Sequence, residues 1–299
     1  MKIKTILGTV IVSISTFAYA AIYWLGNQNL WQVELLTSLK LNKPWVYRQL
    51  VPILARSVAS VLSIRIDLAL VLVVTIAGVG FYLALRRLAF LFYKQNDKVE
   101  ILLILLVLLG LIIFGYDRMP YDLMTAWLFT LAIRYIFLCM DNELLIVFSL
   151  ACLNRETAFL LIIFLGVLAI KSGTRYLLTL QMVLIFVFVQ LALRNVFYAN
   201  AGQAGWIEPM QNLLRFANHP ERTLLHGWIT LGILLTACRE WKLKPYFFRL
   251  AFWSMAPALM LMYIVFGQAF EVRVFWECYP ILALLMLPTL HDWIGTIND

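Results

Sequence analysis

Ten apolar segments follow one another along this chain of 299 residues, separated by mostly short polar connections. Because 63% of the residues are hydrophobic and only 13% are charged, a water-soluble fold of this size could not cover them. In a bilayer, apolar stretches of about 20 residues face hydrocarbon, and their backbone pairs internally as helix. The sequence predicts one all-α, polytopic transmembrane domain over 1–299, with about eight full spans. The segments lie at about 5–25, 66–85, 99–115, 121–140, 144–153, 156–170, 176–197, 223–238, 247–266 and 274–291.

Two of these segments are too short to cross a bilayer alone. At 1.5 Å per residue, a helix over 144–153 reaches about half-way through the hydrocarbon core, and 156–170 is barely longer. Between them stand Asn154, Arg155, Glu156 and Thr157. We therefore expect a broken helical hairpin that carries these four polar residues at its tip.

Lysine and arginine residues indicate the orientation. They cluster near 86–98, 171–175 and 239–249 and at Lys2 and Lys4, and cytoplasmic loops carry such an excess of positive charge. The pattern predicts cytoplasmic N- and C-termini, a bacterial inner-membrane location and a functional face toward the periplasm or exterior. The outer connections are then about 26–65, 116–120, 198–222 and 267–273, together with the hairpin tip.

The N-terminus allows two interpretations. The residues up to Ala20 resemble a secretory signal with its cleavage site. However, the apolar run continues through Leu25, which favours an uncleaved first helix.

The first outer connection, about 26–65, contains two segments of interest. Residues 31–41 are compatible with a short helix that carries Glu34, the first acidic residue of the chain. From Gln49 to Arg65, polar and apolar residues recur at helical spacing, which predicts an amphipathic helix in the membrane interface. A plain packing helix explains the same pattern.

An ionisable side chain within apolar sequence is unfavourable in free energy unless it is paired or hydrated, so each one is a functional candidate. Structural alternatives exist for all of them. The turn before the fourth span would be solvated, Asn154 would cap the helix 156–170, and the two charges after it would neutralise each other. The last two residues of the third group are four apart, which suits an ion pair. The three groups are Asp117, Arg118 and Asp122; Asn154, Arg155 and Glu156; and Glu271, Arg273 and Glu277.

Arginine dominates the basic residues that we place outside, whereas lysine is commoner among those inside. A guanidinium binds phosphate or carboxylate bidentately, and topology does not require it on the outer face. Outward arginines, carboxylates and apolar walls suit a lipid-linked phosphate donor, with its polyprenyl tail between helices. Sugar transfer from such a donor needs a carboxylate base and positive charge at the leaving phosphate. A divalent cation such as Mg²⁺ or Mn²⁺ can supply that charge, and so can arginines.

The architecture resembles that of the C-type (GT-C) membrane glycosyltransferases. The runs 47–52 (YRQLVP), 154–157 (NRET) and 271–273 (EVR) look like those of bacterial membrane proteins in cell-surface polysaccharide pathways. In that family the first outer loop bears the catalytic carboxylate, often as one of two acidic residues. Glu34 is the matching position here, and no second acid stands beside it.

The resemblance implies roles for individual residues. Glu34 is the expected general base, with Asp117 or Glu156 as the alternative. The donor phosphate would be held by Arg48, Arg155 and Arg273, and the remaining substrate-binding residues would be Asp122, Asn154, Glu271 and Glu277. The partners would be the lipid bilayer, a polyprenyl-phosphate-linked sugar and an acceptor glycan, lipid or protein.

Three other functions fit the same spans. A transporter or flippase of a lipid-linked or anionic substrate would use the broken hairpin, although no matching interrupted segment is found in the other half of the sequence. A polysaccharide polymerase or ligase uses closely related chemistry. A non-catalytic subunit would not need the charged groups. The three histidines show no zinc-binding spacing, and without a soluble basic domain nucleic acid is not an expected partner.

Overall fold

The computed structural model describes residues 2–26, 40, 42–113, 119–202, 209–266 and 272–297. This part of the chain is helical and contains no β-strand, as the sequence predicts. The α-helices are α1 (Lys2–Gly26), α3 (Leu50–Leu62), α4 (Ile66–Ala89), α5 (Asp97–Ile113), α6 (Asp122–Leu138), α7 (Asp141–Asn154), α8 (Phe159–Ser172), α9 (Tyr176–Val196), α10 (Pro209–Asn218), α11 (Pro220–Cys238), α12 (Tyr246–Phe266) and α13 (Tyr279–Ile297). Short 3-10 helices are η1 (Trp45–Tyr47), η3 (Glu156–Ala158), η4 (Trp241–Leu243) and η5 (Val272–Glu277).

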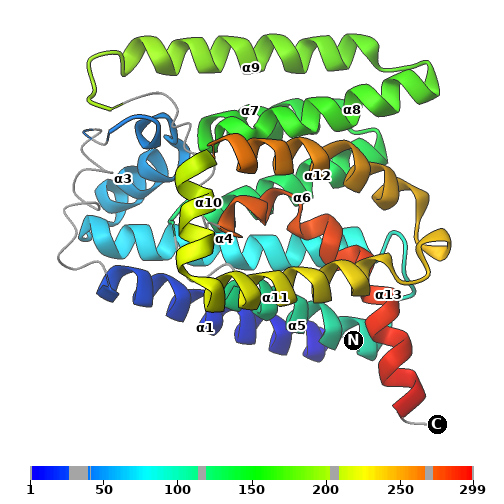
Figure 1. The fold of residues 1–299 in the computed structure, drawn as a ribbon. Coiled ribbons are helices and arrows are strands. Elements are labelled where there is room, and N and C mark those ends of the chain that lie inside the picture. Colours follow the sequence, from blue (N-terminus) through cyan, green and yellow to red (C-terminus); the bar gives the residue numbers. More distant parts are fainter. Residues whose placement is uncertain are drawn as a thin grey trace.

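The long helices lie side by side, and their connections gather at two opposite ends of the bundle (Figure 1). One end, on the right in Figure 1, holds 90–96, 139–140, 173–175 and 239–245, and we call it the basic end. Side chains tie these connections to neighbouring helices, because Lys244 donates to Thr289 of α13 and Arg175 donates to the carbonyl of Ile136 in α6. The opposite end holds the start of α6 and the break between α7 and α8 (Figure 1).

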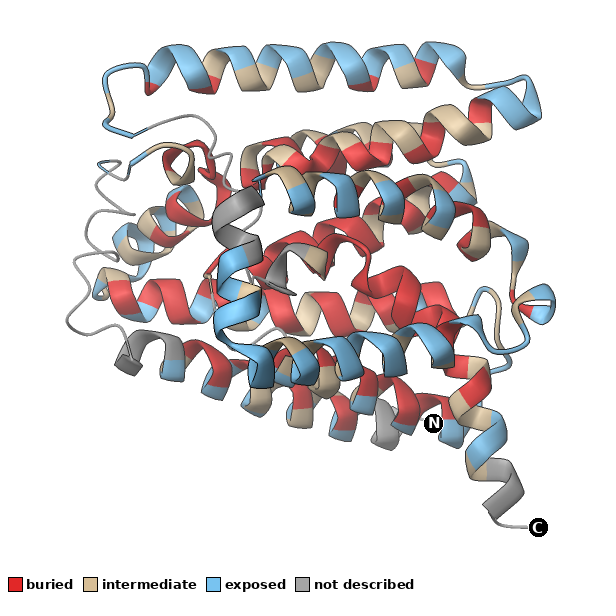
Figure 2. Cartoon of the chain, in the orientation of Figure 1, coloured by how far each residue is buried: buried red, intermediate tan, exposed pale blue. Residues whose placement is uncertain are grey.

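The centre of the bundle is formed by α4, α6 and the first half of α13, which are buried along most of their length (Figure 2). Small residues bring these helices close to their neighbours. A Cβ atom at Gly78 of α4 would lie 2.3 Å from Thr16 Cγ2 of α1. A Cβ at Gly110 of α5 would lie 2.5 Å from the Tyr279 ring of α13. Such close approach is typical of helix packing in membranes, where small residues let backbones meet.

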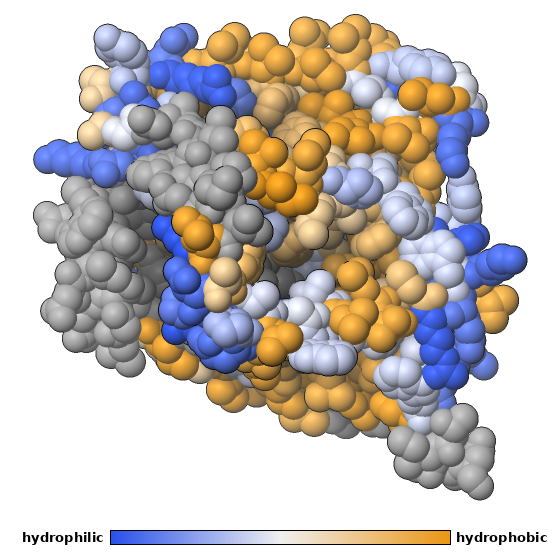
Figure 3. Space-filling view, viewed as in Figure 1, coloured by the Kyte–Doolittle hydropathy of each residue, from blue (hydrophilic) through white to orange (hydrophobic). Residues whose placement is uncertain are grey.

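The outer helices expose apolar side chains. Hydrophobic residues cover the flank of the bundle and hydrophilic ones gather toward its ends (Figure 3). Within the described residues, α4, α9 and α12 are each long and apolar enough to cross a membrane unaided. These three helices support a membrane protein, whereas the total of about eight spans stays a prediction.

Most expected segments agree with the observed helices to within a few residues, with two exceptions. The segment expected at 274–291 begins as the 3-10 helix η5, so that α13 starts only at Tyr279. The outer connection 198–222 contains a helix, α10, that we did not expect. The predicted amphipathic helix at 49–65 is α3, and the helix expected at 31–41 lies outside the described residues.

Candidate functional site

Charged and polar side chains from four segments meet at the end of the bundle opposite the basic end. They come from Arg48 just before α3, from the start of α6, from the break between α7 and α8, and from the end of η5. All but one are buried. We call this set the charged cluster: Arg48, Tyr121, Asp122, Asn154, Arg155, Glu156, Thr157 and Glu277.

Arg48 and Glu156 form the first ion pair of the cluster. Arg48 Nη2 lies 2.7 Å from Glu156 Oε1, and Arg48 Nε donates to Oε2 at 3.2 Å. This bidentate geometry is among the stronger arrangements of a guanidinium and a carboxylate. The backbone N–H of Gln49 donates to the carbonyl of Leu153 at 2.8 Å, which fixes the start of α3 against the hairpin tip. The Arg48 side chain is buried, whereas the Glu156 side chain is 34% exposed, so this pair is the exposed edge of the cluster.

Arg155 forms the buried centre. Its Nη1 lies 3.1 Å from Glu277 Oε1 and 3.8 Å from Asp122 Oδ1. The Arg155 side chain is 2% exposed, and both carboxylates are fully buried. Thr157 Oγ1 also donates to Glu277 Oε1. Because charges this deep are tolerated only when paired, the three residues hold α6, η5 and the hairpin tip together.

Arg155 and Glu156 do not neutralise each other, contrary to the structural alternative drawn from the sequence. Arg155 has an extended backbone (φ −161°, ψ 141°) between α7 and η3, and successive side chains of an extended segment point to opposite sides. Arg155 therefore reaches Glu277, and Glu156 reaches Arg48. Asp122, the last residue of the expected solvated turn, is itself not solvated, because it is fully buried and its carboxylate accepts a hydrogen bond from the backbone N–H of Met119.

Asn154 is not the N-cap of the second hairpin helix, which was the other structural expectation. It is the last residue of α7, while Arg155 caps η3 and Ala158 precedes α8. Its amide nitrogen donates to the Tyr121 carbonyl at 3.2 Å and to Thr125 Oγ1 at 2.8 Å. Asn154 therefore joins the hairpin tip to α6.

Sequence reasoning missed Tyr121. Its hydroxyl accepts a hydrogen bond from Arg48 Nη1, and its ring centroid lies 4.6 Å from the Arg48 guanidinium carbon and 5.8 Å from that of Arg155. The phenol ring thus contacts both cations of the cluster. No local pattern in the sequence links this tyrosine to an arginine 73 positions earlier.

Four predicted site residues cannot be compared with this geometry. Glu34, Asp117 and Glu271 lie outside the described residues. Arg273 belongs to η5, but its side chain is outside the described part. The ion pair predicted between Arg273 and Glu277 therefore stays a prediction. The predicted residues that the structure brings together are Arg48, Asp122, Asn154, Arg155, Glu156 and Glu277.

The cluster has hydrogen-bonding capacity left over. Arg155 Nε, Asn154 Oδ1 and Glu277 Oε2 are buried and have no hydrogen-bond partner among the described residues. Buried polar atoms are nearly always paired with protein groups or ordered water, so these three atoms leave room for water, for a further part of the chain or for a ligand to bond there. Among the described residues, no three His, Cys, Asp or Glu side chains are grouped to hold a metal ion.

Electrostatics decide what Glu156 can do chemically. Burial alone would raise the pKa of its carboxyl, but the neighbouring guanidiniums of Arg48 and Arg155 outweigh burial and lower this pKa to about 2. A general base works best with a pKa near the operating pH. Glu156 is therefore suited to accept hydrogen bonds and is a poor proton acceptor.

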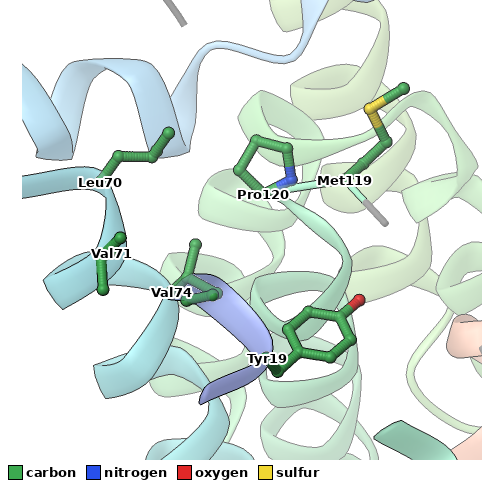
Figure 4. A pocket seen from close by; sticks show the side chains of 7 residues that line it. Tyr19, Leu70, Val71, Val74, Met119 and Pro120 are labelled. Atoms are coloured by element: carbon green, nitrogen blue, oxygen red, sulfur yellow. The ribbon is translucent and has the colours of Figure 1, made fainter. Parts of the chain in front are cut away.

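A small apolar pocket lies next to the start of α6. It is lined by Tyr19 and Ala20 of α1, Leu70, Val71 and Val74 of α4, and Met119 and Pro120 (Figure 4). Its lining is almost entirely hydrocarbon, in contrast to the charged cluster. The two are adjacent in the chain, because Pro120 lines the pocket and Tyr121 belongs to the cluster.

No family model matches the chain, and no match was found among curated proteins or solved structures.

Proposed function

We propose that this chain is an integral membrane glycosyltransferase that moves a sugar from a polyprenyl-phosphate donor to an acceptor at the outer face of the bilayer. The charged cluster is the observation that carries the proposal. Four separate segments bring two guanidiniums and three carboxylates to one end of an otherwise apolar bundle. Ionisable groups in such a setting mark functional positions by default.

The distribution of basic residues supports the proposed orientation. The connections at the basic end carry lysine and arginine clusters around 86–98, 171–175 and 239–249. Placing this end in the cytoplasm follows the positive-inside pattern. The charged cluster then faces the periplasm or exterior, where lipid-linked sugars are used.

The geometry supports different roles for the two arginines. Glu156 is the exposed partner of its ion pair with Arg48, so sugar hydroxyls can donate to this carboxylate, while the buried Arg48 guanidinium supplies positive charge directly behind it. Arg155 is held by Glu277 and is a positioning residue. The low pKa of Glu156 disfavours it as the base, so Glu34 remains the proposed general base.

The proposed reaction is a displacement at the sugar C1 atom. The base takes the proton of the acceptor hydroxyl, and the acceptor oxygen forms a bond to C1. The bond between C1 and the phosphate oxygen breaks, and its electron pair leaves with the polyprenyl phosphate. Arg48 would stabilise that developing negative charge.

A transporter is the second candidate, because one observation favours it. The α7–η3–α8 hairpin is interrupted at a buried charged residue, Arg155, and interrupted helices of this kind line substrate paths in transporters.

A transfer assay in membranes separates the two. Wild type is offered a panel of radiolabelled polyprenyl-phosphate sugars beside the variants Glu34→Gln, Glu156→Gln and Glu143→Gln. Glu143 is an exposed carboxylate at the start of α7, on the basic end, and serves as the control. We expect transfer by wild type and by the control, and a fall of about 10²–10⁴-fold in Glu34→Gln. Binding of donor lipid without transfer in wild type would reject the enzyme and favour the transporter.

A further inference from the structure

A second group of side chains lies at the basic end, between the end of α8 and the start of α12. Lys171 Nζ donates to the Tyr246 hydroxyl at 2.6 Å and lies 5.3 Å from the centroid of the same ring. The Arg249 guanidinium carbon lies 5.7 Å from that centroid. Two cations therefore lie beside the same phenol ring.

Among the described residues, neither of these two cations pairs with a carboxylate. At the same end, Arg86 pairs with Glu100, Arg175 with Asp141 and Arg239 with Glu240. Across the described residues, no ion pair includes Lys171 or Arg249, and Arg249 Nε is buried with no hydrogen-bond partner there. Two positive charges beside the same ring attract an anion, so this position is suited to a phosphate group.

An apolar track continues from the two cations. Tyr246, Arg249 and Trp253 are spaced by three and four residues, so they share one face of α12. Tyr246 and Trp253 are 56% and 63% exposed, and Met260 and Ile264 are exposed further along the helix. Ile170 of α8 is exposed beside Lys171. A hydrocarbon chain has apolar surface to follow from this point, and tyrosine and tryptophan are typical of the membrane–water interface.

We infer that Lys171, Tyr246 and Arg249 form a binding site for an anionic phospholipid, with the phosphate held by the two cations and the acyl chains lying along α12. Basic pockets between helices on the cytoplasmic side of membrane proteins bind such headgroups. The site rests on the membrane location of the chain and does not depend on sugar transfer. It lies at the opposite end of the bundle from the charged cluster (Figure 1).

Lipid retention by the purified full chain tests the site. Native mass spectrometry would measure the affinity for phosphatidylglycerol relative to phosphatidylcholine in wild type, Lys171→Gln, Arg249→Gln and the double variant. Each lost charge is expected to lower the relative affinity about fivefold, since one basic residue near an anionic surface contributes about that factor. Arg249→Lys keeps the charge and should retain most of the preference.

Two exposed lysines of the basic end supply matched controls. Lys94→Gln and Lys242→Gln remove the same charge at positions away from the Tyr246 ring, and each should change the relative affinity less than about twofold. An equal loss in the controls would overturn the inference in favour of diffuse surface charge. Displacement of the lipid by inorganic phosphate would overturn it in favour of a free phosphate ion. Unfolding temperatures without anionic lipid verify that each variant folds.

Discussion

Replacing Arg155 with methionine should destabilise the fold more than any single change at the surface. The substitution keeps an unbranched chain but removes the guanidinium that lies 3.1 Å from Glu277 and 3.8 Å from Asp122. Both carboxylates are fully buried and would lose this counter-charge. Breaking a buried pair by removing one partner costs about 3–5 kcal/mol, which shifts the unfolding equilibrium by roughly two to three and a half orders of magnitude.

Arg239→Met is the matched control for this experiment. Arg239 also pairs with a carboxylate, at 3.6 Å from Glu240, but both side chains are exposed, at 46% and 47%. Exposed pairs contribute about 0–1 kcal/mol. Unfolding would be followed by circular dichroism during titration of mixed micelles with a denaturing detergent. Equal stability losses in the two variants would refute the reasoning that burial, and not ion pairing as such, sets the cost.

A second variant tests the same reasoning from the opposite side. Adding Glu277→Gln to Arg155→Met neutralises one of the two carboxylates left without their counter-charge. The double variant should therefore be more stable than Arg155→Met alone, because coupled residues are not additive. A double variant that loses the sum of both single effects would show that Arg155 and Glu277 act independently.

Three further changes test packing, hydrogen bonding and pH. Gly78→Ala places a Cβ within 2.3 Å of a side chain of α1 and should lower the free energy of unfolding by about 1–3 kcal/mol. In Gly227→Ala the new Cβ meets no atom within 4 Å, so this variant should be neutral or slightly stabilising. The two variants are compared by unfolding in micelles. Asn154→Ala removes two buried hydrogen bonds to α6 and should cost about 1–3 kcal/mol in the same assay. Because the folded pKa of Glu156 is lowered to about 2 from 4.5, its contribution to stability is complete above pH 4.5 and is lost as the pH falls through 2. The stability difference between wild type and Glu156→Gln should shrink over that range, and a difference independent of pH would contradict this assignment.

The sequence by itself determined the local features of this structure. The length and apolar character of 66–85, 176–197 and 247–266 determined three long helices, because an apolar run of that length has few other solutions. The two short segments around residues 154–157 also indicated a broken hairpin, since neither is long enough to span alone. These features depend on neighbours along the chain, which is what a sequence pattern records.

The partners within the charged cluster were decided only by the tertiary structure. From spacing alone, Arg155 would neutralise Glu156. In the fold Arg155 contacts Glu277, 122 positions away, and Glu156 contacts Arg48, 108 positions away. An extended backbone at Arg155 turns the adjacent side chains apart, and the packing of α6 and η5 against the hairpin brings each distant counter-charge into reach. Local patterns hold no information about which segments meet, so the sequence named most of these residues but could not pair them.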